Sequence, residues 1–302
     1  MKIYVIGGGA IGLLVSAYLK KKNNEVTLCT RTKAQADQLN QQGLTLIRND
    51  QSELIPIHSV TLKQAKVEEA DVCLFAVKSY DLEPIMKEIT SKRKKDQSYL
   101  FLQNGMTHVE LASKLPDPTI AFATVSHGAV RLNQTTVQHT GVGEVNWAMY
   151  QQRTNYLTDW LHTLPSSEFP VYEHDKWEEL LWSKLLVNVC INPITALTGM
   201  KNGELLESTE LKQFMKCVFD EAFLLHPLQP DKERHWSQVL SVCKQTAENT
   251  SSMLVDIKHE RQTEVDAILG YLLRRAKANG LSLPTISFLY QALINREQSY
   301  QL

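Results

Sequence analysis

The sequence predicts an α/β domain followed by an all-α domain. In the first half, short apolar segments rich in β-branched residues alternate with longer segments of helical periodicity, as in a parallel sheet with helical crossovers. In the second half the strand signal fades, and apolar residues recur at spacings of three and four, as in helices. The length of 302 residues is about twice that of a common domain. We therefore expect two domains, at 1–168 and 169–302.

The predicted elements follow from these patterns in chain order. Four segments are apolar on both faces, as buried parallel strands should be, and they cover 3–6, 25–29, 71–77 and 99–102. Helical patterns of the first half cover 11–22, 33–42, 82–90 and 109–115, and 120–147 reads as further strands and turns. Helices of the second half are predicted at 177–198, 205–225, 236–248 and 265–278. We expect Pro193 to kink or end the first of these.

Charge and composition exclude several functions. With 32 Lys+Arg and 33 Asp+Glu the net charge is −1, so nucleic acid is not expected as a partner. No apolar run approaches the roughly 20 residues of a membrane span, and the N-terminus lacks a signal-peptide pattern. The five cysteines are scattered, without a CxxC pair. They predict reduced thiols and a cytoplasmic protein, and no residue grouping has the spacing of metal ligands.

A glycine-rich segment lies between the first predicted strand and the first predicted helix. It reads G-x-G-x-x-G and consists of Gly7, Gly8, Gly9, Ala10, Ile11 and Gly12. In this context Gly7 allows a tight turn, Gly9 lets a pyrophosphate approach the backbone, and Gly12 lets the helix pack on the strand. The helix N-terminus adds unpaired N–H groups and a positive dipole. The segment predicts a Rossmann-type dinucleotide-binding domain, and a simple tight turn is the alternative.

The end of the second predicted strand indicates which dinucleotide binds. NAD sites usually carry an Asp or Glu there, about 20 residues after the glycines, for the ribose 2′-hydroxyl. Here residues 29–33 read Cys-Thr-Arg-Thr-Lys, without an acid. Arg31 can pair with a 2′-phosphate and stack on the adenine, while Lys33 adds charge. The sequence therefore favours NADP, unless Arg31 is an ordinary solvated loop residue.

Polar residues follow two later strands, at the sheet edge where ligands of open α/β sheets bind. Lys78 follows the strand at 71–77, and Asn104 follows the strand at 99–102. Either residue can face the nicotinamide half of the cofactor or the substrate. An ordinary polar loop residue is an equally good interpretation of each.

Three polar residues repeat at intervals of four in the predicted helix 177–198. They are Lys184, Asn188 and Asn192, with apolar residues around them. A helix stacks such residues on one face. A solvated stripe is one explanation. The other is a ligand cleft, where burial lowers the pKa of a lysine and makes Lys184 a candidate proton donor.

These features together resemble the ketopantoate reductase family, the 2-dehydropantoate 2-reductases of pantothenate synthesis, over nearly the whole chain. The resemblance rests on the glycine motif and on Ala-Val-Lys-Ser at 76–79, Gln-Asn-Gly at 103–105, K-x-x-x-N-x-x-x-N-P at 184–193 and R-x-T-E-x-D at 261–266. Many dehydrogenases share the glycine motif, whereas the ordered combination is much more specific. Gln262 stands where a proline is common, which affects backbone stiffness more than chemistry.

The resemblance implies a reaction and a set of site residues. It implies that NADPH delivers a hydride to the C2 ketone of 2-dehydropantoate, giving (R)-pantoate and NADP+, in a cleft between the two domains. Lys184 is then the group that polarises the ketone and protonates the alkoxide, as general acids do. Glu264 would hold the substrate hydroxyl and order the site beside the cofactor, although the residue pattern alone favours a surface carboxylate.

Further residues match the family's binding positions. The resemblance implies cofactor contacts from Arg31, Lys78 and Asn104, with Asn104 also near the substrate. It implies substrate contacts from Asn188, Asn192, Ser252 and Asn202. For Asn202 the alternative is a turn or cap role beside Gly203.

Two other functions stay open. One is a related reductase of 2-keto acids or β-hydroxyacids on the same plan, because a few side chains decide the substrate. The other is a non-catalytic NADP-binding regulator, against which Lys184 and Glu264 argue, since binding alone needs neither. The apolar helices of the second domain can support a homodimer, but each also needs a core to pack against.

Overall fold

The computed structural model describes residues 1–94, 96–115, 118–228 and 231–301. Contacts between residues divide the chain into two compact units, and each is described here by itself. Unit 1 comprises Met1–Gln103 and His108–Leu180, and unit 2 comprises Asn104–Thr107 and Leu181–Leu302.

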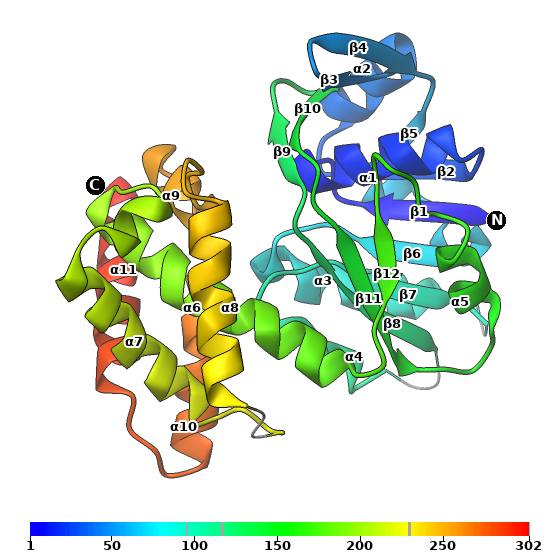
Figure 1. The fold of residues 1–302 in the computed structure, drawn as a ribbon. Helices are drawn as coiled ribbons and strands as arrows, with labels where there is room; N and C mark the ends of the chain where they lie inside the picture. Colours follow the sequence, from blue (N-terminus) through cyan, green and yellow to red (C-terminus); the bar gives the residue numbers. More distant parts are fainter. Residues whose placement is uncertain (95, 116–117, 229–230, 302) are drawn as a thin grey trace. The chain divides into compact units, whose positions relative to one another are not determined.

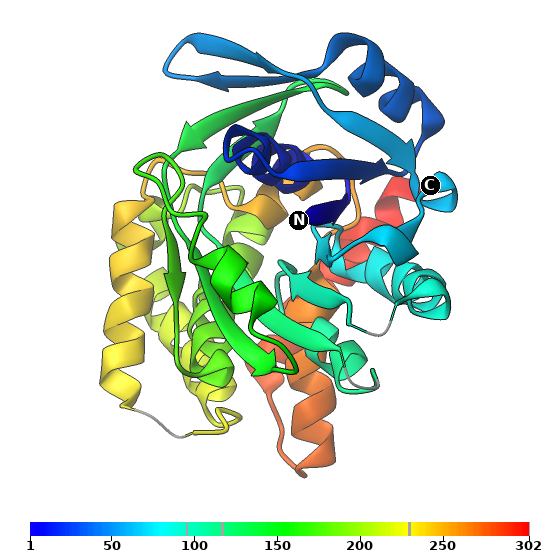
Figure 2. The same cartoon turned by 90° about the vertical axis from the view of Figure 1, so that its right-hand side faces the viewer.

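Two sheets form the framework of unit 1 (Figure 1). The main sheet has the order β12-β11-β8-β7-β6-β1-β2-β5, and all its neighbouring strands are parallel except β8 and β11. The second sheet has the order β4-β3-β10-β9, and Figure 2 shows its blue and green strands side by side. The strands are β1 (Lys2–Ile6), β2 (Glu25–Thr30), β3 (Leu44–Arg48), β4 (Gln51–Ile55), β5 (His58–Thr61), β6 (Val72–Phe75), β7 (Ser98–Phe101), β8 (Thr119–Val125), β9 (Gly128–Arg131), β10 (Thr136–Gly141), β11 (Val145–Gln151) and β12 (Val171–Glu173).

The helices alternate with strands in the first half of the chain and follow one another in the second. Those of the first half are α1 (Ala10–Lys21), α2 (Lys33–Gln42), α3 (Ser79–Lys92), α4 (Thr107–Ala112) and α5 (Tyr156–Leu161), with short 3₁₀ turns η1 (Leu62–Gln64) and η2 (Val67–Glu69). Those of the second half are α6 (Trp177–Thr198), η3 (Gly203–Leu206), α7 (Thr209–Phe223), α8 (Lys232–Gln245), α9 (Ser252–Lys258), the π-helix η4 (Asp266–Gly270), α10 (Tyr271–Ala278), α11 (Pro284–Gln298) and η5 (Ser299–Gln301). The predicted α/β and all-α succession is confirmed.

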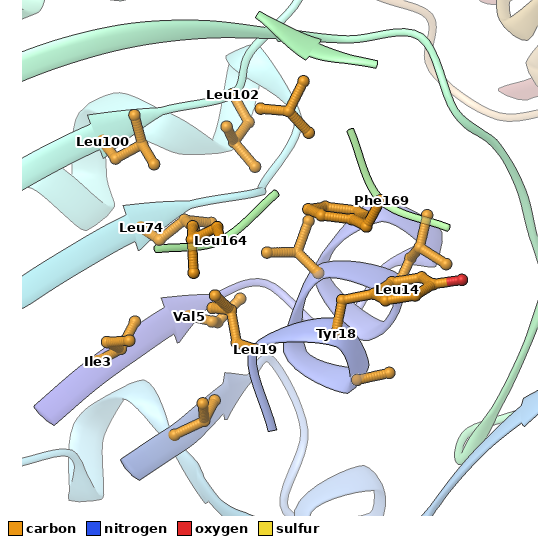
Figure 3. Close-up of a cluster of buried hydrophobic side chains, with 14 of the residues drawn as sticks. Ile3, Val5, Leu14, Tyr18, Leu19, Leu74, Leu100, Leu102, Leu164 and Phe169 are labelled. Carbon is orange, nitrogen blue, oxygen red and sulfur yellow. The ribbon is translucent and has the colours of Figure 1, made fainter. Parts of the chain in front are cut away.

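The strands of the main sheet are apolar on both faces because both faces are covered. On one face, strand residues pack against α1 in a buried cluster (Figure 3) that includes Ile3, Val5, Leu74, Leu100, Leu14, Tyr18 and Leu19. On the other face the rings of Phe75 and Phe101 stack with centroids 4.7 Å apart, and His108 of α4 lies against Phe101. Alternate side chains of one strand point to opposite faces, so each strand supplies both layers.

The division between the units falls after Leu180 rather than near residue 168. Strand β12 pairs in parallel with β11 and so extends the main sheet. Trp177, the first residue of α6, packs against Phe122 and Tyr150, with ring centroids 5.5 Å and 5.3 Å apart. The segment that joins the two halves of the sequence is therefore part of the sheet domain, and the sequence pattern did not reveal this pairing.

Helix α6 bears on two expectations from the sequence. It continues through Pro193 to Thr198, so the proline does not end it. It is also long and apolar enough to cross a membrane by length and composition, although polar residues interrupt its apolar runs. The mean hydropathy of the helix stays high despite its few polar residues, whereas the same polar residues divide it into short apolar runs. Of its most apolar stretch, 72% is buried inside the structure, and core helices of globular proteins pass the same test.

The turn between β1 and α1 requires glycine at two positions. Gly7 has φ +121°, and a Cβ atom there would lie 2.8 Å from the carbonyl oxygen of Ala76. A Cβ atom on Gly12 would lie 1.8 Å from the carbonyl oxygen of Gly7. By contrast, a Cβ atom on Gly9 would meet no atom within 4 Å. Gly7 and Gly12 thus have the turn and packing roles that the sequence predicts.

We expect Gly12→Ala to destabilise unit 1 by about 3 kcal/mol, near the upper end of the usual cost of overpacking, because backbone must move to admit the methyl group. Chemical denaturation followed by circular dichroism measures this loss. Gly9→Ala is the matched control and should change the free energy of unfolding by no more than about 0.5 kcal/mol. Equal stability of the two variants would contradict the packing role of Gly12.

Candidate active site

The glycine loop of unit 1 ends in open space at the start of α1. Gly9 is exposed and precedes the first residue of the helix, and no acidic residue lies in the first helical turn. The backbone N–H of Gly7 donates to the carbonyl of Cys29 at 2.9 Å, which joins the loop to the end of β2. Unpaired N–H groups at a helix start attract anions. The loop therefore fits the pyrophosphate of a dinucleotide.

Two side chains that the sequence analysis did not identify hold this loop from outside. The carbonyl of Gly8 accepts hydrogen bonds from Gln35 of α2 at 2.9 Å and from Arg131 of β9 at 3.2 Å. Gln35 is buried and also donates to the carbonyl of Gln134 at 3.0 Å. A buried glutamine in a helix is a weak signal in a sequence, and Arg131 has none, because its strand comes more than a hundred residues later.

The end of β2 carries an ion pair. The side chain of Arg31 is 74% exposed and pairs with Asp81 in the first turn of α3. Lys78 lies at the N-cap of the same helix and is half-buried. Arg31 thus has an acidic partner that the sequence analysis missed. The available signal was a carboxylate in the first turn of a helix, where the dipole favours it.

In unit 2, the polar stripe lies on one continuous helix. Lys184, Asn188 and Asn192 fall within α6 at intervals of four, so they share a face. Lys184 is half-buried by surface area, Asn188 likewise, and Asn192 is buried. Loss of solvent around the ammonium group lowers the pKa of Lys184 from 10.5 to about 8, and the nearby carboxylate of Glu264 partly opposes this shift. Lys184 therefore has the pKa of a group that can give up a proton near neutrality.

Glu264 is a buried carboxylate with an amide partner. Its Oε2 atom accepts a hydrogen bond of 2.9 Å from Nδ2 of Asn104, and the side chain is 6% exposed. Asn104 groups with unit 2 although it follows β7 in the sequence, and Met106 donates from its backbone to the carbonyl of Ala267 at 3.2 Å. Lys184, Glu264 and Asn104, which come from three distant segments, thus form one cluster, which we call the lysine cluster.

The backbone next to Glu264 is tied to the last helix. Oε1 of Glu297 in α11 accepts from the backbone N–H of Thr263 at 2.9 Å and from its hydroxyl at 2.5 Å. The same hydroxyl accepts from the backbone N–H of Val265 at 3.1 Å. The sequence analysis predicted no helix at 284–298 and did not identify Thr263 or Glu297 as candidates.

Two other predicted residues, Asn202 and Ser252, form no hydrogen bond with the lysine cluster within the described part of the chain. Nδ2 of Asn202 donates to the hydroxyl of Thr246 at 2.9 Å, and its side chain makes no cap hydrogen bond to the turn η3 that follows. Ser252 is exposed at the start of α9, whereas its neighbour Ser251 caps that helix and contacts Thr195 of α6 at 2.7 Å. Substrate contacts by Ser252 and Asn202 stay predictions.

A search for metal-binding groups covered the described ranges. Within them, no three His, Cys, Asp or Glu side chains gather closely enough to hold a metal ion. The cysteines are free, and Cys217 is the exposed one.

Comparison with known proteins identifies the family in both halves of the chain. The family model described as "Ketopantoate reductase PanE/ApbA" matches residues 3–152, and the model of its C-terminal part matches residues 176–297. The 2-dehydropantoate 2-reductase of Bacillus subtilis (strain 168) is 39% identical over 298 residues, which are 97% of this chain and 96% of that protein.

Solved structures agree with this result. A Bacillus subtilis crystal structure described as a "probable 2-dehydropantoate 2-reductase" superposes with a TM-score of 0.88 at 38% identity, covering 98% of this chain and 100% of that one. A D-mandelate dehydrogenase bound to NADH and anilino(oxo)acetate superposes with a TM-score of 0.91 over the full length of both chains, and at 23% identity it shows the fold alone. Over nearly its whole length, therefore, this chain belongs to the ketopantoate reductase family.

Proposed function

We propose that the chain reduces 2-dehydropantoate to (R)-pantoate with NADPH, in the synthesis of pantothenate and coenzyme A. The observation that carries this proposal is the lysine cluster, which places a partly desolvated lysine beside a buried, hydrogen-bonded carboxylate in a member of this family. A regulator that only binds a dinucleotide has no use for such a cluster. A related 2-keto acid reductase is the second candidate, because it would use the same cluster.

Lys184 is the proton donor in this proposal. A ketone that accepts a hydride at carbon becomes an alkoxide, and the ammonium group supplies the proton to its oxygen. Before that step the positive charge polarises the carbonyl, and its effect is larger where water is scarce. A lysine with a pKa of about 8 is mostly protonated at neutral pH, and it releases the proton more readily than an exposed lysine.

Glu264 and Asn104 orient the substrate in this proposal. The carboxylate of Glu264 can accept a hydrogen bond from the substrate hydroxyl while its other oxygen receives the amide of Asn104. Its charge also keeps Lys184 protonated, since it opposes the effect of burial on the pKa. Asn188, Asn192 and Ser252 are proposed to bind the remaining polar groups of the keto acid, and Asn202 stays an additional candidate.

The cofactor is assigned to unit 1. The loop from Gly7 to Gly12 and the start of α1 would hold the pyrophosphate, and Arg31 would bind the 2′-phosphate. Lys78 of unit 1 is proposed as a further cofactor contact, and the cofactor contacts of Asn104 and Glu264 stay predictions from the resemblance. When bound, NADPH supplies the hydride. A homodimer and a cytoplasmic location stay predictions from the sequence.

The substrate assignment predicts a ranking in a steady-state assay. NADPH oxidation should be fastest, by kcat/KM, with 2-dehydropantoate in a panel of 2-keto acids of different length and branching. The panel needs a β-branched keto acid that lacks the terminal hydroxyl as its matched control, because Glu264 is proposed to bind that hydroxyl. Brisk turnover of another keto acid with none of 2-dehydropantoate would remove the assignment in favour of the second candidate.

The acid role of Lys184 predicts both a mutational effect and a pH dependence. Lys184→Ala should lower kcat by about 100-fold or more, as is usual for a general acid. In the unsubstituted protein, the rate of reduction should fall as pH rises through about 8, because the ammonium form is then lost. Lys212→Ala removes an exposed lysine of α7 and should change neither quantity. An unchanged kcat in Lys184→Ala would exclude the acid role.

The cofactor assignment predicts a difference between two ligands. Arg31→Ala should weaken NADP+ binding by about 10- to 100-fold, the usual range for a hydrogen bond to a charged group, with little effect on NAD+. Titration calorimetry measures both affinities without turnover. Lys87→Ala, an exposed lysine of α3, is the control for a general loss of positive charge. Equal losses for both dinucleotides would refute the 2′-phosphate contact.

A further inference from the structure

We propose that Glu297, in the last turn of α11, is a positioning residue that presents Glu264 to the substrate through Thr263. This inference deepens the proposed function and rests on it. Nothing in the role of Glu297 requires contact with substrate or cofactor. Its task is to hold the backbone from which Glu264 projects.

The contact between Glu297 and Thr263 is a double one to a buried residue. One oxygen, Oε1, receives both the backbone N–H at 2.9 Å and the hydroxyl at 2.5 Å, and Thr263 is 3% exposed. A buried donor that loses its acceptor costs about 1–3 kcal/mol. Without the carboxylate of Glu297, the conformation of Thr263 seen here is therefore destabilised, and the residue is expected to shift towards another acceptor.

The tether then reaches both sides of Glu264. The hydroxyl of Thr263 accepts from the N–H of Val265 at 3.1 Å, so a hydrogen-bonded bridge spans the residue between them. The carbonyl of Glu264 itself accepts from the N–H of Ile268 at 3.1 Å. The backbone of Glu264 is thus held before, at and after the residue, which limits the directions that its side chain can take.

Both partners of the Asn104 to Glu264 hydrogen bond have a separate anchor in unit 2. Asn104 lies in a turn that is fixed where Met106 bonds to the carbonyl of Ala267, inside the π-helix Asp266–Gly270. Glu264 is fixed by the tether to Glu297. π-helices carry one extra residue per turn and often mark functional sites. An error of about 1 Å in either anchor is enough to lower a rate substantially.

The position of Glu297 in its helix is unfavourable for a carboxylate. The last turn of α11 carries the negative end of the helix dipole, which disfavours acidic side chains. At the N-terminus of α11 a carboxylate is favoured by the helix dipole. There Glu221 of α7 accepts from the N–H groups of Thr285 and Ile286 at 2.9 Å each. The two hydrogen bonds from Thr263 compensate the unfavourable position of Glu297, which is consistent with a role in holding Thr263.

The test compares Glu297→Ala with Glu297→Gln and with Glu221→Ala as a matched control. Glu297→Ala should lower kcat about 10-fold, as expected for a displaced orienting group. It should also move the alkaline limb of the pH–rate profile to lower pH, because Glu264 no longer supports the protonated form of Lys184. Glu297→Gln keeps an acceptor oxygen and should restore most of kcat. Glu221→Ala should lower the melting temperature without moving that limb.

The outcomes separate this inference from the proposed function. If the unsubstituted protein does not reduce 2-dehydropantoate, the substrate assignment fails, and the same variants are compared on the keto acid that is reduced. If it is active and Glu297→Ala keeps both kcat and the pH limb, or if Glu221→Ala shifts the limb equally, the positioning role is overturned. Should Glu297→Ala fail to fold, Thr263→Val decides, since it keeps the shape of the residue and loses the bonds of the hydroxyl.

Discussion

The hydrogen bond from Asn104 to the buried carboxylate of Glu264 joins segments 160 residues apart, and the packing of unit 2 around it has to keep both residues in place. Burying an ionised carboxylate costs several kcal/mol unless hydrogen bonds and an opposite charge compensate. The amide of Asn104 supplies one and the ammonium group of Lys184 the other. The turn after β7, helix α6 and the segment before the π-helix must therefore meet, and the surrounding helices pack to allow it.

Periodicity was enough to predict the central strands of the main sheet and most helices, because burial on both faces leaves strong apolar runs, but it did not predict the outer strands β5 and β12. It failed for β4, in which four of five residues are exposed and no apolar alternation exists. The signal that was available there is the turn, since Asn49 and Asp50 both have positive φ, as the tight turn of a hairpin requires. At Asp266–Gly270 periodicity predicted a helix but not its π type, because a π-helix and an α-helix have nearly the same apolar spacing over five residues.

In the candidate site, too, spacing within one element could be predicted, whereas contacts between distant elements could not. The stripe of Lys184, Asn188 and Asn192 could be predicted because its members lie on one helix, where spacing determines the face. The pairing of Glu264 with Asn104 could not be derived from spacing, and only the resemblance to a family indicated that both residues matter. Contacts such as Arg31 with Asp81 depend on how separate elements pack, which local sequence patterns do not encode.

The lysine cluster also shows why residue type alone does not determine the pKa of a lysine. Burial without a carboxylate would lower the pKa of Lys184 further and reduce the fraction of the amine that is protonated. If the ammonium group of Lys184 were solvated beside the carboxylate, its pKa would not fall below that of an exposed lysine. The value of about 8 results from the two opposing effects together. The pKa of Lys184 therefore depends first on its burial and then on the placement of Glu264, and so also on whatever holds the backbone around Glu264 in place.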